Sequence, residues 1–345
     1  MEIIIGLLII AIGAFCQSSC YVPINKIKDW SWESYWIVQG VFAWLVLPFL
    51  GALLAVPAGE SIFGLFAQAN PFNLWMTILF GLLWGVGGLT FGLSMRYLGV
   101  ALGQSIALGT CAGLGTIMGP VLLNIFFPEL NALDSLTFAV ITGVIVTLLG
   151  IAIIGVAGKM KSDGLSEEEK TAAVKDFNFP KGLTIALLAG FMSGCFNVGL
   201  EFGKDINFGE LTDPMFSTLP ATFLVTFGGF ISNAIYCFYQ NQKNGTWSDY
   251  KKGNVWGNNA LFCLLAGGLW YSQFFGLSLG KGFLTSSPTL LTLSFCILMA
   301  LNVTFSNVWG IILKEWKGCS NKTITVLLIG IIVLIVSCFL PQLLA

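Results

Sequence analysis

The sequence predicts an all-α polytopic membrane protein with ten transmembrane helices, arranged as two inverted repeats of five helices. Three observations lead there: the composition, the placement of the basic residues, and a charged stretch near the middle of the chain. The 345 residues are 56% hydrophobic and 10% charged, with a mean hydropathy of +0.85. Soluble domains carry about 25% charged residues. This chain therefore has too few charges to cover a surface that faces water, and lipid is the expected solvent.

Ten apolar segments are long enough to cross a bilayer, which takes about 20 residues per helix. We do not expect the first of them to be a secretory signal, because Glu2 stands where a basic region belongs and Lys26 and Lys28 follow the apolar run. We expect it to be an uncleaved first helix. The ten predicted spans are 3–22, 35–56, 73–95, 100–126, 135–157, 182–203, 214–239, 257–280, 285–313 and 323–343.

The basic residues are segregated between alternate gaps of the apolar segments. Only Lys204 and Lys281 fall in the other set of gaps. Short loops rich in Lys and Arg stay on the cytoplasmic side of a membrane. The pattern therefore predicts a multi-pass protein of the bacterial inner (cytoplasmic) membrane with both termini in the periplasm. The fourteen segregated residues are Lys26, Lys28, Arg96, Lys159, Lys161, Lys170, Lys175, Lys181, Lys243, Lys251, Lys252, Lys314, Lys317 and Lys322.

The charged stretch 159–181 divides the chain into two halves with five spans each. We predict a first repeat at 1–158, a cytoplasmic linker at 159–181 and a second repeat at 182–345. The two halves show weak sequence similarity to each other; for example, residues 91–95 read FGLSM and residues 275–279 read FGLSL. An odd number of spans makes the second copy enter the membrane from the opposite side. Many secondary transporters use such inverted repeats to open one site to two compartments in turn.

Two residue types within the spans predict where helices approach and where they bend. Glycines four residues apart allow close helix contacts, and here they include Gly81/Gly85, Gly88/Gly92 and Gly109/Gly113. Prolines are expected to kink the spans and to free backbone carbonyls near a cavity. These prolines are Pro48, Pro120, Pro220 and Pro288.

No catalytic pattern is present. The chain has no histidine, which excludes Ser-His and Cys-His nucleophiles. It has no GxxxxGK[ST] motif for binding ATP phosphates, and its nine cysteines lack metal-ligand spacing. We expect neither an enzyme nor a bound cofactor.

The spans contain neutral polar residues beside aromatic ones. Amide groups and aromatic rings suit an uncharged, polyhydroxylated solute, because hydroxyls need donors and acceptors while the C–H face of a sugar packs on a ring. We expect such a site near the midplane, between the halves. The alternative for each residue is a hydrogen bond between helices or, as expected for Trp30, Trp32 and Trp36, a place in the interfacial aromatic belt. The candidate substrate-binding residues are Gln17, Trp84, Asn197, Trp270, Tyr271 and Gln273.

Glu201 is the one carboxylate that these span boundaries place inside a helix. Ionisable groups within membranes are costly and mark transport pathways. Glu201 is therefore the candidate proton-coupling residue. The alternative is an interfacial residue that pairs with Lys204, three positions along the same helix.

Several strings in the sequence resemble the L-rhamnose–proton symporter family, which belongs to the drug/metabolite transporter superfamily. The similarity begins with Tyr21, Pro23, Lys26, Lys28 and WSWE at 30–33. It continues in order through WGVG at 84–87, MRYLG at 95–99, GGLWY at 267–271 with QFF at 273–275, and LKEW at 313–316.

This resemblance implies a ten-helix inner-membrane carrier that uses the proton gradient to import L-rhamnose or a closely related deoxysugar. The expected partners are the neutral sugar, protons and the lipid bilayer, with no nucleic acid and no required oligomer. The alternatives are a drug or metabolite exporter on the same scaffold, a carrier for another nutrient, or a membrane sugar sensor that does not transport.

Overall fold

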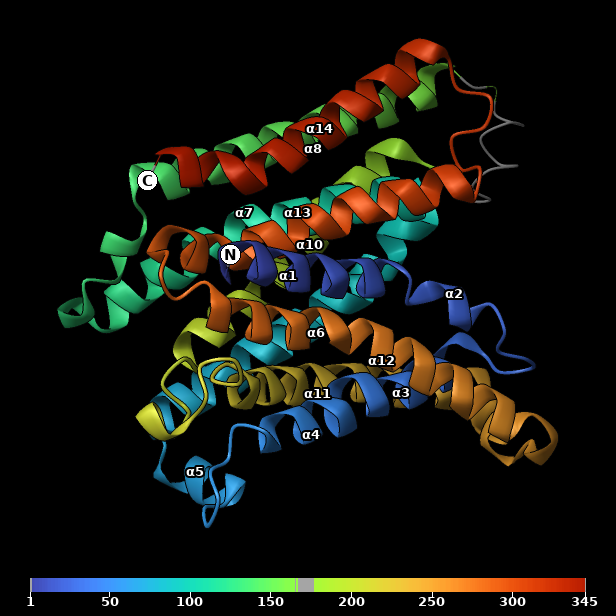
Figure 1. The fold of residues 1–345 in the computed structure, drawn as a ribbon. Coiled ribbons are helices and arrows are strands. Elements are labelled where there is room, and N and C mark those ends of the chain that lie inside the picture. The colour runs from blue at the N-terminus through green and yellow to red at the C-terminus, as the bar shows by residue number, and fades with distance from the viewer. Residues whose placement is uncertain (1, 165, 167–176, 345) are drawn as a thin grey trace. The chain divides into compact units, whose positions relative to one another are not determined.

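The computed structural model describes residues 2–164, 166 and 177–344 (Figure 1). Its described part contains ten helices that are long and apolar enough to cross a membrane, and this confirms the ten predicted spans. They are Glu2–Ile24, Trp32–Leu53, Pro71–Leu98, Ser105–Phe126, Phe138–Lys161, Phe179–Phe202, Leu219–Asn244, Gly253–Phe283, Pro288–Ile312 and Asn321–Leu344.

The helices group into two compact units. Unit 1 comprises Met1–Val86 and Gly199–Phe283, and unit 2 comprises Gly87–Val198 and Leu284–Ala345. Each unit therefore contains spans from both halves of the sequence. Two helices, α6 (Pro71–Leu98) and α10 (Phe179–Phe202), contribute one part to each unit.

In unit 1, α1 packs along α12, and α11 packs against α3 and α4 (Figure 1). Glycines allow the first of these contacts, since a Cβ on Gly13 would lie 2.8 Å from the Ser272 carbonyl oxygen. The glycine pair Gly81/Gly85 packs against α11 as predicted. The elements of unit 1 outside α6 and α10 are α1 (Glu2–Ser18), α2 (Tyr21–Ile24), α3 (Trp32–Gly40), η1 (Val41–Val46), α4 (Leu47–Leu53), α5 (Ile62–Gln68), η4 (Gly209–Leu211), α11 (Leu219–Asn244), η5 (Thr246–Lys251) and α12 (Gly253–Phe283).

The second span is not a regular α-helix, because η1 is a π-helical turn. Pro48 follows this turn at the start of α4. Proline has no backbone N–H, and its ring clashes with the carbonyl four residues earlier, which here belongs to Trp44. The Leu47 N–H instead bonds to the Phe42 carbonyl, five residues back. The predicted distortion at Pro48 thus takes the form of a π-turn, whereas Pro220 and Pro288 lie in the first turns of their helices, where proline fits without a kink.

In unit 2, α14 lies along α8 and α13 lies along α7 (Figure 1). Neutral side chains join these pairs, since Thr147 Oγ1 donates to Ser337 Oγ at 2.9 Å. Gly109 and Gly113 of α7 face α8 as predicted, but a Cβ on Gly88 or Gly92 would meet no described atom within 4 Å, so that pair was wrongly predicted as a contact. Outside α6 and α10 the elements of this unit are α7 (Val100–Phe126), η2 (Pro128–Leu130), η3 (Ala132–Ser135), α8 (Phe138–Gly164), α13 (Pro288–Ile312) and α14 (Asn321–Leu344).

The predicted linker 159–181 is partly helical at its edges. Helix α8 continues to Gly164, and α10 begins at Phe179. Residues 165 and 167–176 of this stretch lie outside the described residues.

Candidate functional site

Three tryptophans of unit 1 meet between η1, α6 and α12. The ring centroids of Trp44 and Trp84 are 6.0 Å apart, those of Trp44 and Trp270 are 6.1 Å apart, and those of Trp84 and Trp270 are 5.6 Å apart. We call these three residues the tryptophan triad. Two of its members, Trp84 and Trp270, were predicted as substrate-binding residues from the sequence.

Glycines make room for the triad. A Cβ on Gly229 of α11 would lie 2.1 Å from Cζ3 of Trp84, and one on Gly40 would lie 2.6 Å from the six-membered ring of Trp44. Trp44 is 4% exposed and Trp84 is 9% exposed. The rings are therefore held in defined positions by neighbouring backbone, as a binding platform requires.

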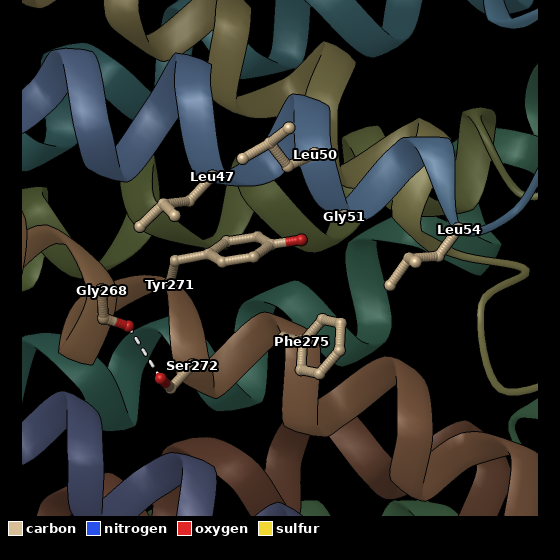
Figure 2. Close-up of a pocket in the computed structure, with 8 residues that line it drawn as sticks. All are labelled: Leu47, Leu50, Gly51, Leu54, Gly268, Tyr271, Ser272 and Phe275. Carbon is tan, nitrogen blue, oxygen red and sulfur yellow. Dashed lines mark hydrogen bonds between the residues drawn. The ribbon is translucent and has the colours of Figure 1, made fainter.

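An open groove of about 440 Å³ lies between α4 and α12, and it shares α12 with the triad. Figure 2 shows the Tyr271 ring reaching from α12 toward α4, with its hydroxyl beside Gly51. The hydroxyl of Ser272 bonds its own helix, at 2.7 Å from the Gly268 carbonyl oxygen. The remaining lining is apolar and consists of Leu47, Leu50, Leu54 and Phe275.

Four buried polar atoms on α1, α3, η1 and α12 have no hydrogen-bond partner among the described residues. They are Oε1 of Gln17, Oε1 of Gln39, Nε1 of Trp44 and the hydroxyl of Tyr271. Each of the four residues is less than 8% exposed. Buried polar groups are paired in the great majority of cases, so a group of unpaired ones requires an explanation. A ligand with its own donors and acceptors provides one.

Gln17 and Gln273 lie on the helices that form the α1–α12 contact. Gln17 stands one turn beyond Gly13, whose neighbours on α12 are Ser272 and Gln273. Gln273 is 3% exposed, and its Nε2 donates to the Trp270 carbonyl at 3.1 Å. Five of the six predicted substrate-binding residues therefore belong to unit 1.

The sixth residue, Asn197, belongs to unit 2. Its Nδ2 donates to the Gly115 carbonyl at 2.9 Å and ties α10 to α7. In this structure Asn197 makes the helix-to-helix contact that was its alternative role.

Trp30 and Trp36, which were expected in an interfacial belt, both pack against other elements of unit 1. Trp36 Nε1 donates to Asn233 Oδ1 at 2.9 Å, and its ring lies 5.7 Å from that of Trp44. Trp30 is 8% exposed and packs with Val255 and Cys263. Trp36 lies within the packing of unit 1 because α3 contacts α11 and α12, and Trp30, which precedes α3, packs against α12 directly.

Glu201 is half-buried in the last turn of α10, in the part that belongs to unit 1. Lys204 is exposed, and no ion pair joins it to Glu201 within the described chain. Among the described residues, Lys281 near the end of α12 interacts electrostatically with Glu201.

A dense hydrogen-bond network lies elsewhere in unit 1, and sequence reasoning did not find it. Asp249 accepts hydrogen bonds from Ser31, Ser34 and Lys252, with Lys252 Nζ at 2.6 Å. Glu33 accepts from Asn244 Nδ2 and Thr246 Oγ1, both at 2.9 Å. We call the set Ser31, Glu33, Ser34, Asn241, Asn244, Thr246, Asp249 and Lys252 the polar clamp.

The polar clamp fixes the segment before α3 to the turn between α11 and α12. Burial opposes ionisation of Asp249, but hydrogen bonds from Lys252, Ser31 and Ser34 outweigh it and lower its pKa to about 2. Asn241 completes the network, since its Oδ1 lies 2.9 Å from Thr246 Oγ1 and 3.2 Å from Ser34 Oγ, while its Nδ2 donates to the Cys237 carbonyl. The carboxylates of the clamp are thus held by donors that serve the fold.

The triad and the groove can bind a neutral ligand. Neither includes a charged side chain among the described residues. The aromatic faces suit the C–H surface of a sugar ring, and the unpaired amide, indole and hydroxyl atoms suit its hydroxyls. Within the described residues, no group of three or more His, Cys, Asp or Glu side chains is placed to hold a metal ion.

Comparison with known proteins agrees with this geometry. A family model described as L-rhamnose–proton symport protein matches residues 1–343. The chain is 31% identical over 342 residues to the L-rhamnose–proton symporter of Yersinia pestis (strain Pestoides F), which covers 97% of this chain and 96% of the relative. It is also 31% identical over 333 residues to the one from Shigella boydii serotype 18, covering 94% and 93%. This chain therefore belongs to the L-rhamnose–proton symporter family.

Proposed function

We propose that this protein imports L-rhamnose or a closely related deoxysugar together with protons across the bacterial inner membrane. The observation that carries the site is the tryptophan triad with unpaired polar atoms beside it, in a chain of this family. L-Rhamnose is a neutral 6-deoxyhexose, so it offers hydroxyls, a C–H face and a methyl group. These features match amides, rings and an apolar wall.

The proposed sugar site is centred on Trp84, Trp270 and Tyr271, with Gln17 and Gln273 on the adjoining faces of α1 and α12. The Tyr271 hydroxyl and the Gln17 carbonyl supply one group that can donate and one that accepts. Asn197 was predicted with this group, but it lies in unit 2, where its side chain bonds the Gly115 carbonyl. A sugar hydroxyl that loses one such partner costs about 1–3 kcal/mol.

The proposed proton carrier is Glu201. A symporter needs a group that gains a proton on one side and loses it on the other, and a chain without histidine has a carboxylate as its natural candidate. Two observations support Glu201: its side chain is half-buried, and it interacts electrostatically with Lys281. Lys281 lies on α12, the helix that also carries Trp270 and Tyr271.

Alternating access by two inverted repeats is the proposed mechanism of transport. Within the units, the packed helix pairs α8–α14, α7–α13 and α4–α11 join spans five and ten, four and nine, and two and seven. An inverted duplication relates the same spans to one another, and this supports the proposal. The proposed orientation, with both termini in the periplasm, has the charge pattern as its support.

The energy source is sufficient for accumulation. One proton that moves inward gains about 2.3 kcal/mol per 100 mV of membrane potential. The decisive test is uptake of radiolabelled L-rhamnose into vesicles with and without an imposed proton gradient, with L-fucose, L-mannose and L-lyxose as competitors. We expect accumulation only with the gradient. Equal accumulation of L-rhamnose with and without the proton gradient would contradict symport.

A further inference from the structure

The second span supplies none of the six residues predicted from the sequence to bind sugar, yet it carries two of the unpaired atoms. Gln39 and Trp44 are 3% and 4% exposed, and neither Gln39 Oε1 nor Trp44 Nε1 has a hydrogen-bond partner among the described residues. One atom is an acceptor and the other is a donor. Leaving each one buried and unpaired opposes folding.

The π-helical turn brings these two side chains toward one face. In a regular α-helix, residues five apart lie about 140° apart around the axis. The wider turn of η1, which begins two residues after Gln39 and contains Trp44, reduces that angle, and such turns occur frequently at functional sites. Pro48 explains why the turn forms at this place, as described above.

Both residues border the same stretch of α12. A Cβ on Gly267 would lie 3.2 Å from the Gln39 backbone oxygen and 3.0 Å from the Ala43 nitrogen. One turn along, the ring of Trp44 lies 6.1 Å from that of Trp270. The unpaired donor and acceptor therefore lie next to the helix that carries Trp270 and Tyr271.

The indoles of this region differ: Trp30 Nε1, like Trp44 Nε1, lacks a hydrogen-bond partner among the described residues, whereas Trp36 has one. Trp36 lies on the same span as Trp44, its ring contacts Trp44, and it is satisfied by Asn233 Oδ1 at 2.9 Å. Asn233 in turn donates to the carbonyls of Gly85 and Gly229, so it joins three helices. The indole N–H of Trp36 therefore has a protein acceptor, whereas that of Trp44 has none among the described residues.

We propose that the indole N–H of Trp44 and the side-chain carbonyl of Gln39 bind hydroxyls of the transported sugar, so that the second span forms one wall of the site. This inference rests on the proposed function and adds two residues to it. A donor and an acceptor on one face match a pair of hydroxyls on a neutral sugar, since every hydroxyl can both donate and accept. The ring of Trp44 adds a third aromatic face to those of Trp84 and Trp270.

The test uses the purified full-length protein in detergent and in proteoliposomes, with L-rhamnose as the probe. Gln39→Met removes the acceptor at nearly constant volume, and Trp44→Phe removes the donor. We expect each change to weaken L-rhamnose affinity by about five- to a hundredfold. Affinity is read from the sugar-dependent rise of the unfolding midpoint and from the concentration dependence of counterflow.

The signature that separates ligand contact from a structural role is stability without sugar. Gln39→Met deletes an atom that lacks a partner in the protein, so its midpoint should equal or exceed that of the wild type. Trp36→Phe is the matched control, because it breaks the bond to Asn233 and should lower the midpoint while affinity stays within about twofold.

Three results would overturn the inference or its basis. Unchanged affinity in Gln39→Met or in Trp44→Phe removes the second span from the site. Loss of the folded protein in Gln39→Met shows that Gln39 serves the fold instead. If the wild type itself neither transports L-rhamnose nor is stabilised by it, the proposed function fails, and this is recognisable because no variant is needed to see it.

Discussion

The polar clamp and the tryptophan triad occupy the same unit and use the same second span, but they differ in how their polar atoms are paired. In the clamp, Asp249 accepts from Ser31, Ser34 and Lys252. At the triad, Trp44 Nε1 and Gln39 Oε1 are buried without a partner among the described residues. A satisfied buried network rigidifies a fold, whereas an unsatisfied one costs stability until a partner arrives. The difference separates a structural region from a binding region.

The largest expected effect is at the centre of the clamp. Asp249→Ala leaves the donors of Ser31, Ser34 and Lys252 without their acceptor. Leaving a buried donor without its acceptor costs about 1–3 kcal/mol, and several donors are affected, so we expect the unfolding midpoint in detergent to fall sharply and the yield of folded protein to drop. Asp134→Ala is the control, since Asp134 is exposed and should change stability by about 0.5 kcal/mol or less. Equal effects of the two substitutions would show that the clamp does not stabilise the fold.

The second effect is the pH dependence of the same residue. The pKa of Asp249 is about 2 in the folded protein, against about 3.9 for a free aspartate. A lowered pKa gives stabilisation that is complete above pH 4 to 5 and is lost as the pH falls toward 2. This contribution is about 2–3 kcal/mol. Measured between pH 7 and pH 2.5, the stability difference between wild type and Asp249→Asn should be constant above pH 5 and shrink below it; a difference that changes between pH 5 and 7 would contradict the assignment.

The third effect is at the groove beside the triad. A Cβ at position 51 would lie 1.9 Å from the Tyr271 hydroxyl, so Gly51→Ala has to displace that ring. Overpacking of this kind costs about 1–3 kcal/mol, and we expect weaker L-rhamnose affinity as well. Gly268→Ala lies in the same groove, but its Cβ would meet Leu47 at an ordinary 3.8 Å. If both variants bind L-rhamnose like the wild type, the position of Tyr271 does not matter to the site.

The sequence predicts the spans well because membrane helices are selected by apolar length, a local property. Trp84, Trp270 and Tyr271 could also be found, since polar and aromatic residues within apolar segments are few. Which of these residues meet depends on contacts across the chain. Trp36 and Asn233 are 197 positions apart, and Ser31 and Asp249 are 218 apart.

The role of Trp44 was hidden for a related reason. Its missing partner and its place on a π-turn appear only when the backbone is known. Pro48 in the sequence was the available signal, because a proline within a span removes one helical hydrogen bond. Asp249 gave no signal at all, since a charged residue in a predicted loop is ordinarily solvated.

The smallest expected effect on stability comes from Glu201, where we expect the largest effect on coupling. Glu201→Gln keeps the size of a half-buried side chain that forms no ion pair in the described chain, so the free energy of unfolding should change by about 0.5 kcal/mol or less. It removes the group proposed to carry the proton. Accumulation of L-rhamnose driven by a proton gradient should therefore be abolished, while exchange of labelled for unlabelled sugar continues. Glu60→Gln, at an exposed carboxylate of the same unit, should leave both measurements unchanged. If Glu201→Gln still concentrates sugar, Glu201 has a structural role beside Lys281, and another carboxylate near a helix end, such as Asp205 or Glu33 of the clamp, becomes the candidate to test by the same pair of measurements.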